Sequence, residues 1–408
     1  MPQEILDMVI DAVAGSERYK SSLSACSLVC RLWTPRTRHH LFRNVTLSSL
    51  GPNVSPIEIL MNERDGIDTN ESTNEDEDSE VSRLAIFASM LRSAYCTFGP
   101  HIRSMLIFRT RNCRNDLHYD AMGKDLKRRC PNIKELRLDG LFSASKPYDG
   151  LMCGFPNVTH FSIGFHLSGK SNSTLGMIHS LPSLRRLLVR PQIATPLVFC
   201  GLHGQGPPYS PHELLPPRHL HDIETGRENT AHLFSWLRTF KWLEKIDTLK
   251  LSPGPADHSQ YVVECMNLMG PTLRHLKLDR EVTLSGRPTR YTSLLHVVDL
   301  SKLTNLQTLT LADIHVSHQN PETYVKYLEF LLRISVPSKL ETLVIECPAC
   351  AVEQLDLINW AAIDKFFANG THFPKLRSVA VQLRGASSKE YFEKKLPLLC
   401  DWDLLGFP

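Results

Sequence analysis

The segment Gly164–Ser171 has the residue types and spacing of a phosphate-binding loop. It reads Gly-Phe-His-Leu-Ser-Gly-Lys-Ser and fits the pattern G-x-x-x-x-G-K-[ST], in which backbone amides surround the phosphates and Lys170 would reach the terminal ones. The bulky side chains of Phe165 and His166 suit such a tight nest of amides poorly. Nucleotide binding through this segment is therefore an alternative that the rest of the chain must support.

Cysteine and histidine form two further patterns that could carry chemistry. Cys347 and Cys350 make a single C-x-x-C without a second pair at zinc-site spacing, and His39 and His40 adjoin arginines, as surface charge commonly does. The sequence contains neither G-x-S-x-G nor H-E-x-x-H. We therefore expect a protein that is not an enzyme, without catalytic residues, metal site or cofactor, whose eleven cysteines stay reduced and mostly buried.

An internal repeat organises the chain from residue 84 onward. The pattern Leu-x-x-Leu-x-Leu, with substitutions among apolar types, occurs nine times, at Ile102-Met105-Ile107, Ile133-Leu136-Leu138, Val158-Phe161-Ile163, Leu184-Leu187-Val189, Ile246-Leu249-Leu251, Leu273-Leu276-Leu278, Leu306-Leu309-Leu311, Leu340-Leu343-Ile345 and Leu376-Val379-Val381. Successive starts lie 25 to 36 residues apart, except for one gap of 62 after Leu184. The pattern resembles degenerate leucine-rich repeats.

The spacing within each repeat predicts a strand followed by a crossover to the next parallel strand. The last two apolar positions are two residues apart, so their side chains point to the same side of a strand, and the remainder is long enough for a helix. One repeat cannot bury its own apolar face, so neighbours must stack. We therefore expect an α/β solenoid with a parallel sheet over residues 84–408, interrupted by a proline-rich surface loop at 191–232.

Several cations alternate with the apolar positions in the middle repeats. They are Arg186, Arg190, Lys250, His275 and Lys277. If the strands line one exposed face, these side chains would form a basic patch, and arginine and lysine pair well with carboxylates and phosphates. The hypothesis is that this patch binds an acidic or phosphorylated segment of a protein substrate, against the alternative that it is ordinary solubilising charge.

The first 47 residues form a separate region with its own apolar pattern. Ile5, Leu6, Val9 and Ile10 follow one another along one face of a predicted helix, and two shorter apolar sets come after it. Helices this short are only marginally stable alone, so their apolar residues need a further surface to cover them.

The order of residues in this region resembles an F-box. The matching residues are Pro2, Glu4, Ile5, Leu6, Ile10, Ser27, Leu28, Val29, Cys30, Arg31, Trp33, His40, Leu41 and Phe42, and Met1 stands where the family has leucine. The resemblance implies a three-helix domain over residues 1–47 that binds a Skp-type adaptor. It assigns adaptor binding, by position, to Pro2, Ile5, Leu6, Ile10, Leu28, Val29, Cys30, Trp33 and Leu41. F-boxes are often followed by leucine-rich repeats, as they are here.

This resemblance implies a role in protein degradation rather than in chemistry. The chain would be the substrate-recognition subunit of a Skp-cullin-F-box ubiquitin ligase, joined through the adaptor to cullin and RING subunits, with the solenoid holding the protein substrate. An F-box scaffold that acts outside ubiquitin transfer is the alternative with the same partners.

Composition sets the remaining limits. The chain has 408 residues with 42% hydrophobic and 22% charged residues, as is ordinary for a soluble globular protein, and no apolar run reaches the ~18 residues of a membrane helix. We expect it in the cytoplasm or nucleus, without a membrane or nucleic-acid partner. Residues 48–83 form a predicted linker, whose part 62–83 carries nine acidic and two basic side chains and is expected to be disordered.

Overall fold

The computed structural model shows two compact units. The first contains Met1–Leu188 with Pro207–His219, and the second contains Val189–Gly206 with Leu220–Pro408. The structure describes residues 3–14, 22–26, 33–48, 83–94, 96–109, 119–143, 149–152, 154–168, 173–189, 215–226, 229–252, 259–279, 298–312, 339–347, 355–356, 358–369, 373–383 and 389–406. The acidic part of the predicted linker, except Arg83, lies outside these residues.

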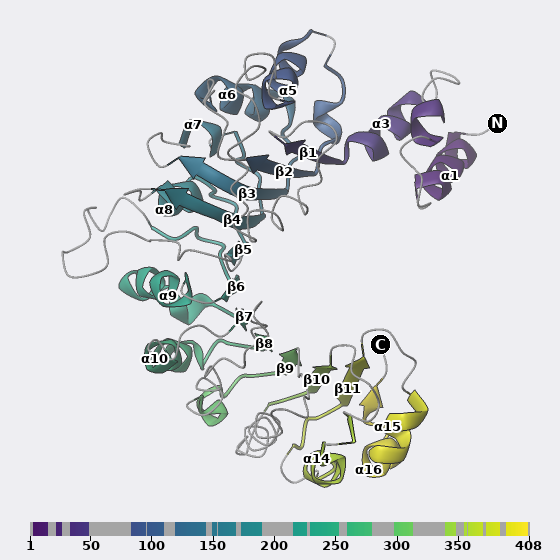
Figure 1. The fold of residues 1–408 in the computed structure, drawn as a ribbon, viewed down its shortest axis with the longest axis vertical. Helices are drawn as coiled ribbons and strands as arrows, with labels where there is room; N and C mark the ends of the chain where they lie inside the picture. Colours follow the sequence, from purple (N-terminus) through teal and green to yellow (C-terminus); the bar gives the residue numbers. More distant parts are fainter. Residues whose placement is uncertain are drawn as a thin grey trace, which may run out of the picture. The chain divides into compact units, whose positions relative to one another are not determined.

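The first unit begins with helices and continues as strands that alternate with helices. Its elements are α1 (Gln3–Ala14), α3 (Thr34–Phe42), β1 (Asn44–Ser48), α5 (Arg83–Arg92), the 3-10 helix η1 (Gly99–His101), β2 (Ser104–Arg109), α6 (Tyr119–Arg129), β3 (Glu135–Ser143), α7 (Asp149–Met152), β4 (His160–Ser168), α8 (Ser173–His179) and β5 (Arg186–Val189). Residues 22–26 are also helical. Helices α5 to α8 lie on one side of these strands (Figure 1).

The second unit repeats the alternation of strand and helix. Its elements are β6 (Asp222–Gly226), α9 (Asn229–Thr239), η2 (Leu243–Lys245), β7 (Thr248–Ser252), α10 (Ser259–Met269), β8 (His275–Asp279), η4 (Leu300–Lys302), β9 (Thr308–Ala312), β10 (Thr342–Cys347), α14 (Trp360–Phe367), β11 (Ser378–Leu383), α15 (Lys389–Lys395), α16 (Pro397–Asp401) and β12 (Leu405–Gly406). Strand order in the sheet follows the chain, and the neighbouring strands whose pairing is described are parallel. No helix among the described residues is long and apolar enough to cross a membrane.

Equivalent apolar residues of successive repeats stack in register and form the core. In the second unit Leu249 on β7 lies beside Leu276, and Leu276 lies beside Leu309 on the next strand. All three side chains are at most 1% exposed. Alternate residues point away from this core, as the pleat of a strand requires. The predicted α/β fold with a parallel sheet is therefore confirmed, and all nine predicted strands are present.

Side-chain hydrogen bonds between turns join some successive repeats of the first unit. The Asn132 side-chain amide donates to the Pro100 carbonyl at 2.8 Å, and Asn157 donates to the Pro131 carbonyl at 2.9 Å. These prolines stand just before the strands in the repeat pattern. These hydrogen bonds satisfy carbonyl groups in turns where no helix or strand partner is available, which explains why proline followed by asparagine recurs there.

Three strands lie outside the predicted repeats and correct the predicted boundaries. Residues 44–48 form β1, where Val45 and Leu47 pair with Met105 and Ile107, so the end of the region predicted as F-box belongs to the sheet. Strand β6 and the start of α9 lie in the predicted loop 191–232, whose end was wrong. The third is the short strand β12, which pairs with β11. Strand β6 divides the gap of 62 residues into two repeats of ordinary length.

Candidate partner-binding surfaces

Helix α1 presents an exposed apolar surface. Ile5, Met8 and Val9 are 47%, 70% and 44% exposed, and their spacing places them on one side of the helix. Leu6 and Ile10 lie on the other side and are 7% and 0% exposed. The helix therefore has two apolar sides, of which one contributes to the core of the first unit and the other is available to a partner. Met8 and Val9 were not among the predicted adaptor-binding residues.

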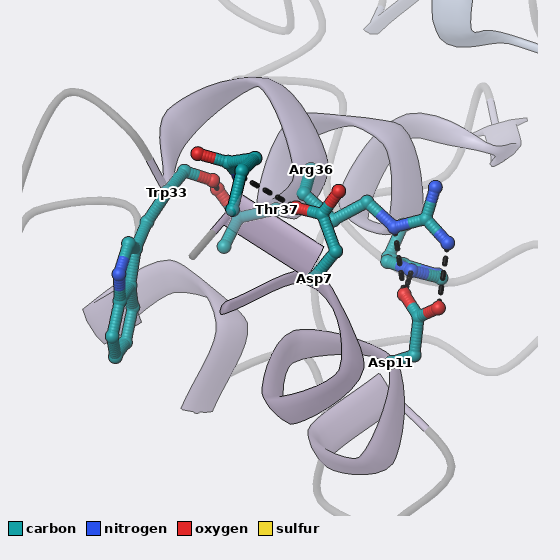
Figure 2. A network of polar contacts seen from close by, with 7 residues as sticks. Asp7, Asp11, Trp33, Arg36 and Thr37 are labelled. Carbon is teal, nitrogen blue, oxygen red and sulfur yellow. Dashed lines mark hydrogen bonds and ion pairs between the residues drawn. The ribbon is translucent and has the colours of Figure 1, made fainter. Parts of the chain in front are cut away.

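An ion-pair cluster fixes α1 against α3. The Arg36 guanidinium donates from Nε to Asp11 Oδ1 at 2.7 Å and from Nη2 to Asp11 Oδ2 at 2.6 Å (Figure 2). His40 Nε2 lies 2.8 Å from Asp11 Oδ1. The hydrogen bonds from Arg36, and then from His40, hold the pKa of Asp11 well below its ordinary value, and Asp11 in turn raises the pKa of Arg36. A bidentate pair of this kind sets the orientation of α1 as well as its position.

Helix α3 also connects α1 to the repeats. Thr37 is fully buried. Its hydroxyl lies 2.9 Å from the Trp33 carbonyl oxygen and 3.0 Å from the Thr34 carbonyl oxygen, so it can donate a hydrogen bond to either one. The ring of Phe42 stacks on Phe98, with centroids 4.9 Å apart. Phe42 also precedes Val45 by three residues, which is the distance between the first two apolar positions of the repeat pattern. The last turn of α3 therefore supplies the first apolar residue of the repeat that contains β1.

The predicted adaptor-binding residues occupy different environments. Ile5 is exposed, Leu6 and Ile10 are in the core, and Trp33 and Leu41 are half-buried. The other four lie outside the described residues: Pro2, Leu28, Val29 and Cys30. Within the described residues, the exposed side of α1 is thus the surface that best fits a docking role.

The charged residues in the middle of the second unit form a network instead of a basic patch. Lys250 Nζ lies 2.7 Å from Glu224 Oε1 on the preceding strand and 3.2 Å from Asp279 Oδ2. Burial opposes the charge of Lys250, but the hydrogen bond from Glu224 and the charge of Asp279 outweigh it and raise the pKa of Lys250. This lysine is therefore held as a cation by the chain's own carboxylates.

Lys277 belongs to the same network. Its Nζ lies 2.6 Å from Glu346 Oε1 on β10 and 3.9 Å from Asp279 Oδ1. With Lys250, Glu224 and Asp279 the network has two cations and three carboxylates, a net charge of −1 (2 − 3). The two lysines therefore do not form a free basic surface, because carboxylates from other repeats neutralise them. Substrate binding by the predicted residues stays a prediction.

The other residues predicted to bind substrate do not restore the patch. His275 is exposed at the start of β8, Arg186 begins β5 and interacts within the chain, and Arg190 lies outside the described residues. Sequence reasoning missed Glu224 because its strand was read as loop. It missed Glu346 because nothing local indicates that a side chain two strands away reaches Lys277.

The phosphate-loop match has strand geometry over its first half. Residues 164–168 belong to β4, and Gly164, Phe165 and His166 pair in register with residues 139–141 of β3. Amides that take part in a sheet cannot all turn toward one phosphate, so this arrangement disfavours the nucleotide-binding alternative. Lys170, Ser171 and Cys350 lie outside the described residues. Among those described, no group of three or more histidine, cysteine or acidic residues could hold a metal ion.

Comparison with known proteins gives likenesses of structure but none of sequence. No protein-family model matches the chain, and no curated protein is similar to it in sequence. The chain is similar to the crystal structure of the leucine-rich repeat-containing protein LegL7 from Legionella pneumophila, with a TM-score of 0.43 and 13% identity, over 86% of this chain and 97% of that one. The assignment therefore depends on the chain's own repeats and strands. These define an α/β repeat solenoid of the leucine-rich-repeat type, an architecture that offers extended surfaces for protein binding.

Proposed function

We propose that this chain is a non-catalytic adaptor that joins a protein substrate to a ubiquitin ligase. In this proposal α1 and α3 belong to an F-box that binds a Skp-type adaptor, and the repeat solenoid binds the substrate. The observation that carries the proposal is the exposed side of α1, made by Ile5, Met8 and Val9. This side of the helix lies in the part of the sequence that resembles an F-box.

Leaving these apolar side chains exposed to water costs free energy. Three large apolar residues on one helical face lose contact with water when a partner covers them, and fully burying each such side chain is worth roughly 1.5–3 kcal/mol. Aliphatic anchors with charge at the rim are the usual composition of an interface centre. The Asp11–Arg36 pair keeps α1 in place, so little order has to be gained on binding.

In this role the chain contributes position rather than chemistry. A substrate held by the solenoid would have its lysine near a charged ubiquitin-conjugating enzyme, and proximity alone accelerates a transfer reaction. The cullin and RING subunits would be joined through the Skp-type adaptor. Degradation of the substrate is the outcome proposed for this arrangement.

The test is co-purification of the full chain with a Skp-type adaptor after co-expression. The informative variant is Ile5→Glu with Val9→Glu, which places charge on the exposed side of α1. The matched control is Leu268→Glu on α10 of the second unit, because Leu268 is 42% exposed, close to the 44% of Val9. We expect stoichiometric adaptor with wild type and control and at least tenfold less with the double variant, while all three give the same circular dichroism spectrum.

Two outcomes would contradict the proposal. A folded wild-type chain that retains no Skp-type adaptor would remove the F-box assignment. A wild-type chain that binds the adaptor, but whose captured protein is not ubiquitylated when cullin, RING and ubiquitin-conjugating subunits are added, would leave the scaffold role in place of the ligase role.

A further inference from the structure

The first unit contains a polar cavity at the start of its first three strands. The cavity has a volume of about 360 Å³, and its lining includes His40, Arg43, Asn44, Arg103, Ser104 and Glu135. His40 is engaged with Asp11. The remaining charged groups are two guanidiniums and one carboxylate, so the cavity itself is cationic.

The two arginines occupy the same position in successive repeats. The carbonyl of Arg43 accepts hydrogen bonds from the amides of Arg103 and Ser104, at 2.9 and 3.0 Å. The carbonyl of Arg103 accepts those of Lys134 and Glu135 in the same way, at 2.8 and 3.1 Å. Adjacent strands are about 4.8 Å apart, so Arg43, Arg103 and Lys134 form a row of three cations along the sheet, called the cationic row below.

No ion pair among the described residues neutralises the cationic row, although the Glu135 carboxylate lines the same cavity. The backbone carbonyl of Lys134 accepts a hydrogen bond from the Thr159 hydroxyl at 3.3 Å. The side chains of Arg43, Arg103 and Lys134 form no ion pair or hydrogen bond with another described residue. Like charges that face each other on neighbouring strands destabilise a sheet. Burial lowers the pKa of His101, and Arg103 is among the cations that lower it further. The row therefore keeps a net positive charge, which acts on its surroundings.

The repeat itself does not require cations at this position. In the second unit the equivalent position lies just before each strand, and the backbone there bonds to the next repeat in the same way. Its successive residues are Asp247, Arg274, Gln307, Glu341 and Arg377. Asp247 Oδ1 lies 3.3 Å from Nδ1 of His221, the residue at the equivalent position of the preceding repeat. Charges of both signs and a neutral residue thus alternate there. In the first unit this position continues with the neutral Thr159, after three cations in succession at Arg43, Arg103 and Lys134. This run of three cations needs an explanation of its own.

We propose that the cationic row and its cavity bind an acidic segment of a partner protein, with anionic side chains on Arg43 and Arg103. Guanidiniums bind carboxylates and phosphates through paired hydrogen bonds, and two of them line this cavity. Asn44 and Ser104 supply further polar groups in the same cavity, and Glu135 can accept a backbone N–H of the bound segment. The cationic row contains none of the residues first predicted to hold an acidic substrate.

This inference names the chemistry of the partner that the solenoid would hold, and in that sense it extends the proposed function. It does not depend on the Skp-type adaptor, since the binding surface is complete in the chain alone. Loss of adaptor binding with intact peptide binding would contradict the ligase role only, and the reverse result would contradict this inference only.

The test measures binding of a fluorescent peptide to the full chain by anisotropy. The probe is Gly-Glu-Ser-Glu-Glu-Ser-Glu-Gly, used unmodified, with both serines phosphorylated, and with every glutamate replaced by glutamine. The variant is Arg43→Gln with Arg103→Gln. The matched control is Arg274→Gln with Arg377→Gln, which removes two arginines from the equivalent position of the second unit.

We expect the acidic probes to bind wild type and control equally and the variant at least about tenfold more weakly, since hydrogen bonds to charged groups are individually strong. Affinity should fall as salt rises. The phosphorylated and unmodified probes show whether phosphate or carboxylate is preferred. Equal binding to the variant and wild type, or to the glutamine probe, would overturn the inference. So would tighter binding of a single-stranded oligonucleotide of equal charge, which would mark a nucleic-acid surface instead.

Discussion

Lys277 on β8 and Glu346 on β10 form an ion pair across the strand that separates them. Lysine Nζ lies 2.6 Å from one carboxylate oxygen of Glu346 and 2.8 Å from the other. Thr310 on β9, which pairs with Lys277 in register, lies between the two strands. The pair therefore links repeats that are not neighbours. The Lys277 charge, which the sequence analysis predicted to bind substrate, is paired within the chain.

This pair should contribute measurably to stability. Its side chains are 29% and 19% exposed, so water screens the attraction only in part. A double-mutant cycle with Lys277→Met and Glu346→Gln should give a coupling free energy of about 1 kcal/mol in urea unfolding at low salt. A coupling of zero would mean that the two groups exchange solvent for each other without gain.

Thr225 on β6 should be replaceable with a gain in stability. It stands where other repeats have a large apolar residue, is 2% exposed, and its hydroxyl has no hydrogen-bond partner among the described residues. Valine has the same shape without the unpaired group, so Thr225→Val should raise the free energy of unfolding by about 1 kcal/mol. Urea unfolding measures this change.

Thr37→Val is the contrasting control for that substitution. Thr37 is equally buried, but its hydroxyl lies within hydrogen-bond distance of two carbonyls. The same change should therefore lower stability by about 1 kcal/mol. If both threonine variants shift stability in one direction, hydrogen bonding is not what distinguishes the two sites.

Buried Asp364 should be essential for the last helix of the chain. It is 3% exposed, and its carboxylate accepts the backbone amides of Leu398 and Leu399 at 3.0 and 2.9 Å, in the first turn of α16. Asp364→Ala leaves both amides unpaired and should cost about 2–3 kcal/mol, whereas Asp364→Asn keeps one acceptor and should cost less. Thermal unfolding of both variants tests this order, and equal losses would contradict it.

The attachment of α1 should weaken in acid. Hydrogen bonds from Arg36 and His40 lower the pKa of Asp11 below its ordinary 3.8. A lowered carboxyl pKa contributes stability above the unfolded value, and this contribution is lost as pH falls through the folded value. The difference in unfolding free energy between wild type and Asp11→Asn should therefore be present near pH 7 and shrink below about pH 4. Urea unfolding at several pH values measures it, and a constant difference would contradict the assigned cause.

The repeat pattern did not predict strands β1 and β6. Strand β6 was missed because Thr225 takes a position at which an apolar residue was expected and because prolines precede it. Strand β1 was missed because Phe42, Val45 and Leu47 had already been assigned to the helical region. In both cases pairing with neighbouring strands outweighs the local signal, since each new strand completes its hydrogen bonds on a preformed edge.

Sequence alone determined the α/β solenoid, because a strand buries alternate residues and the apolar spacing records that burial whatever lies next to it. It also located the apolar residues of α1, although it did not divide them between core and surface. Only the tertiary structure decided which charges are neutralised. Lys250 and Lys277 meet carboxylates from other repeats, while Arg43 and Arg103 meet none among the described residues. Electrostatic pairing depends on distances of a few ångströms between residues far apart in the chain, and no local pattern contains those distances.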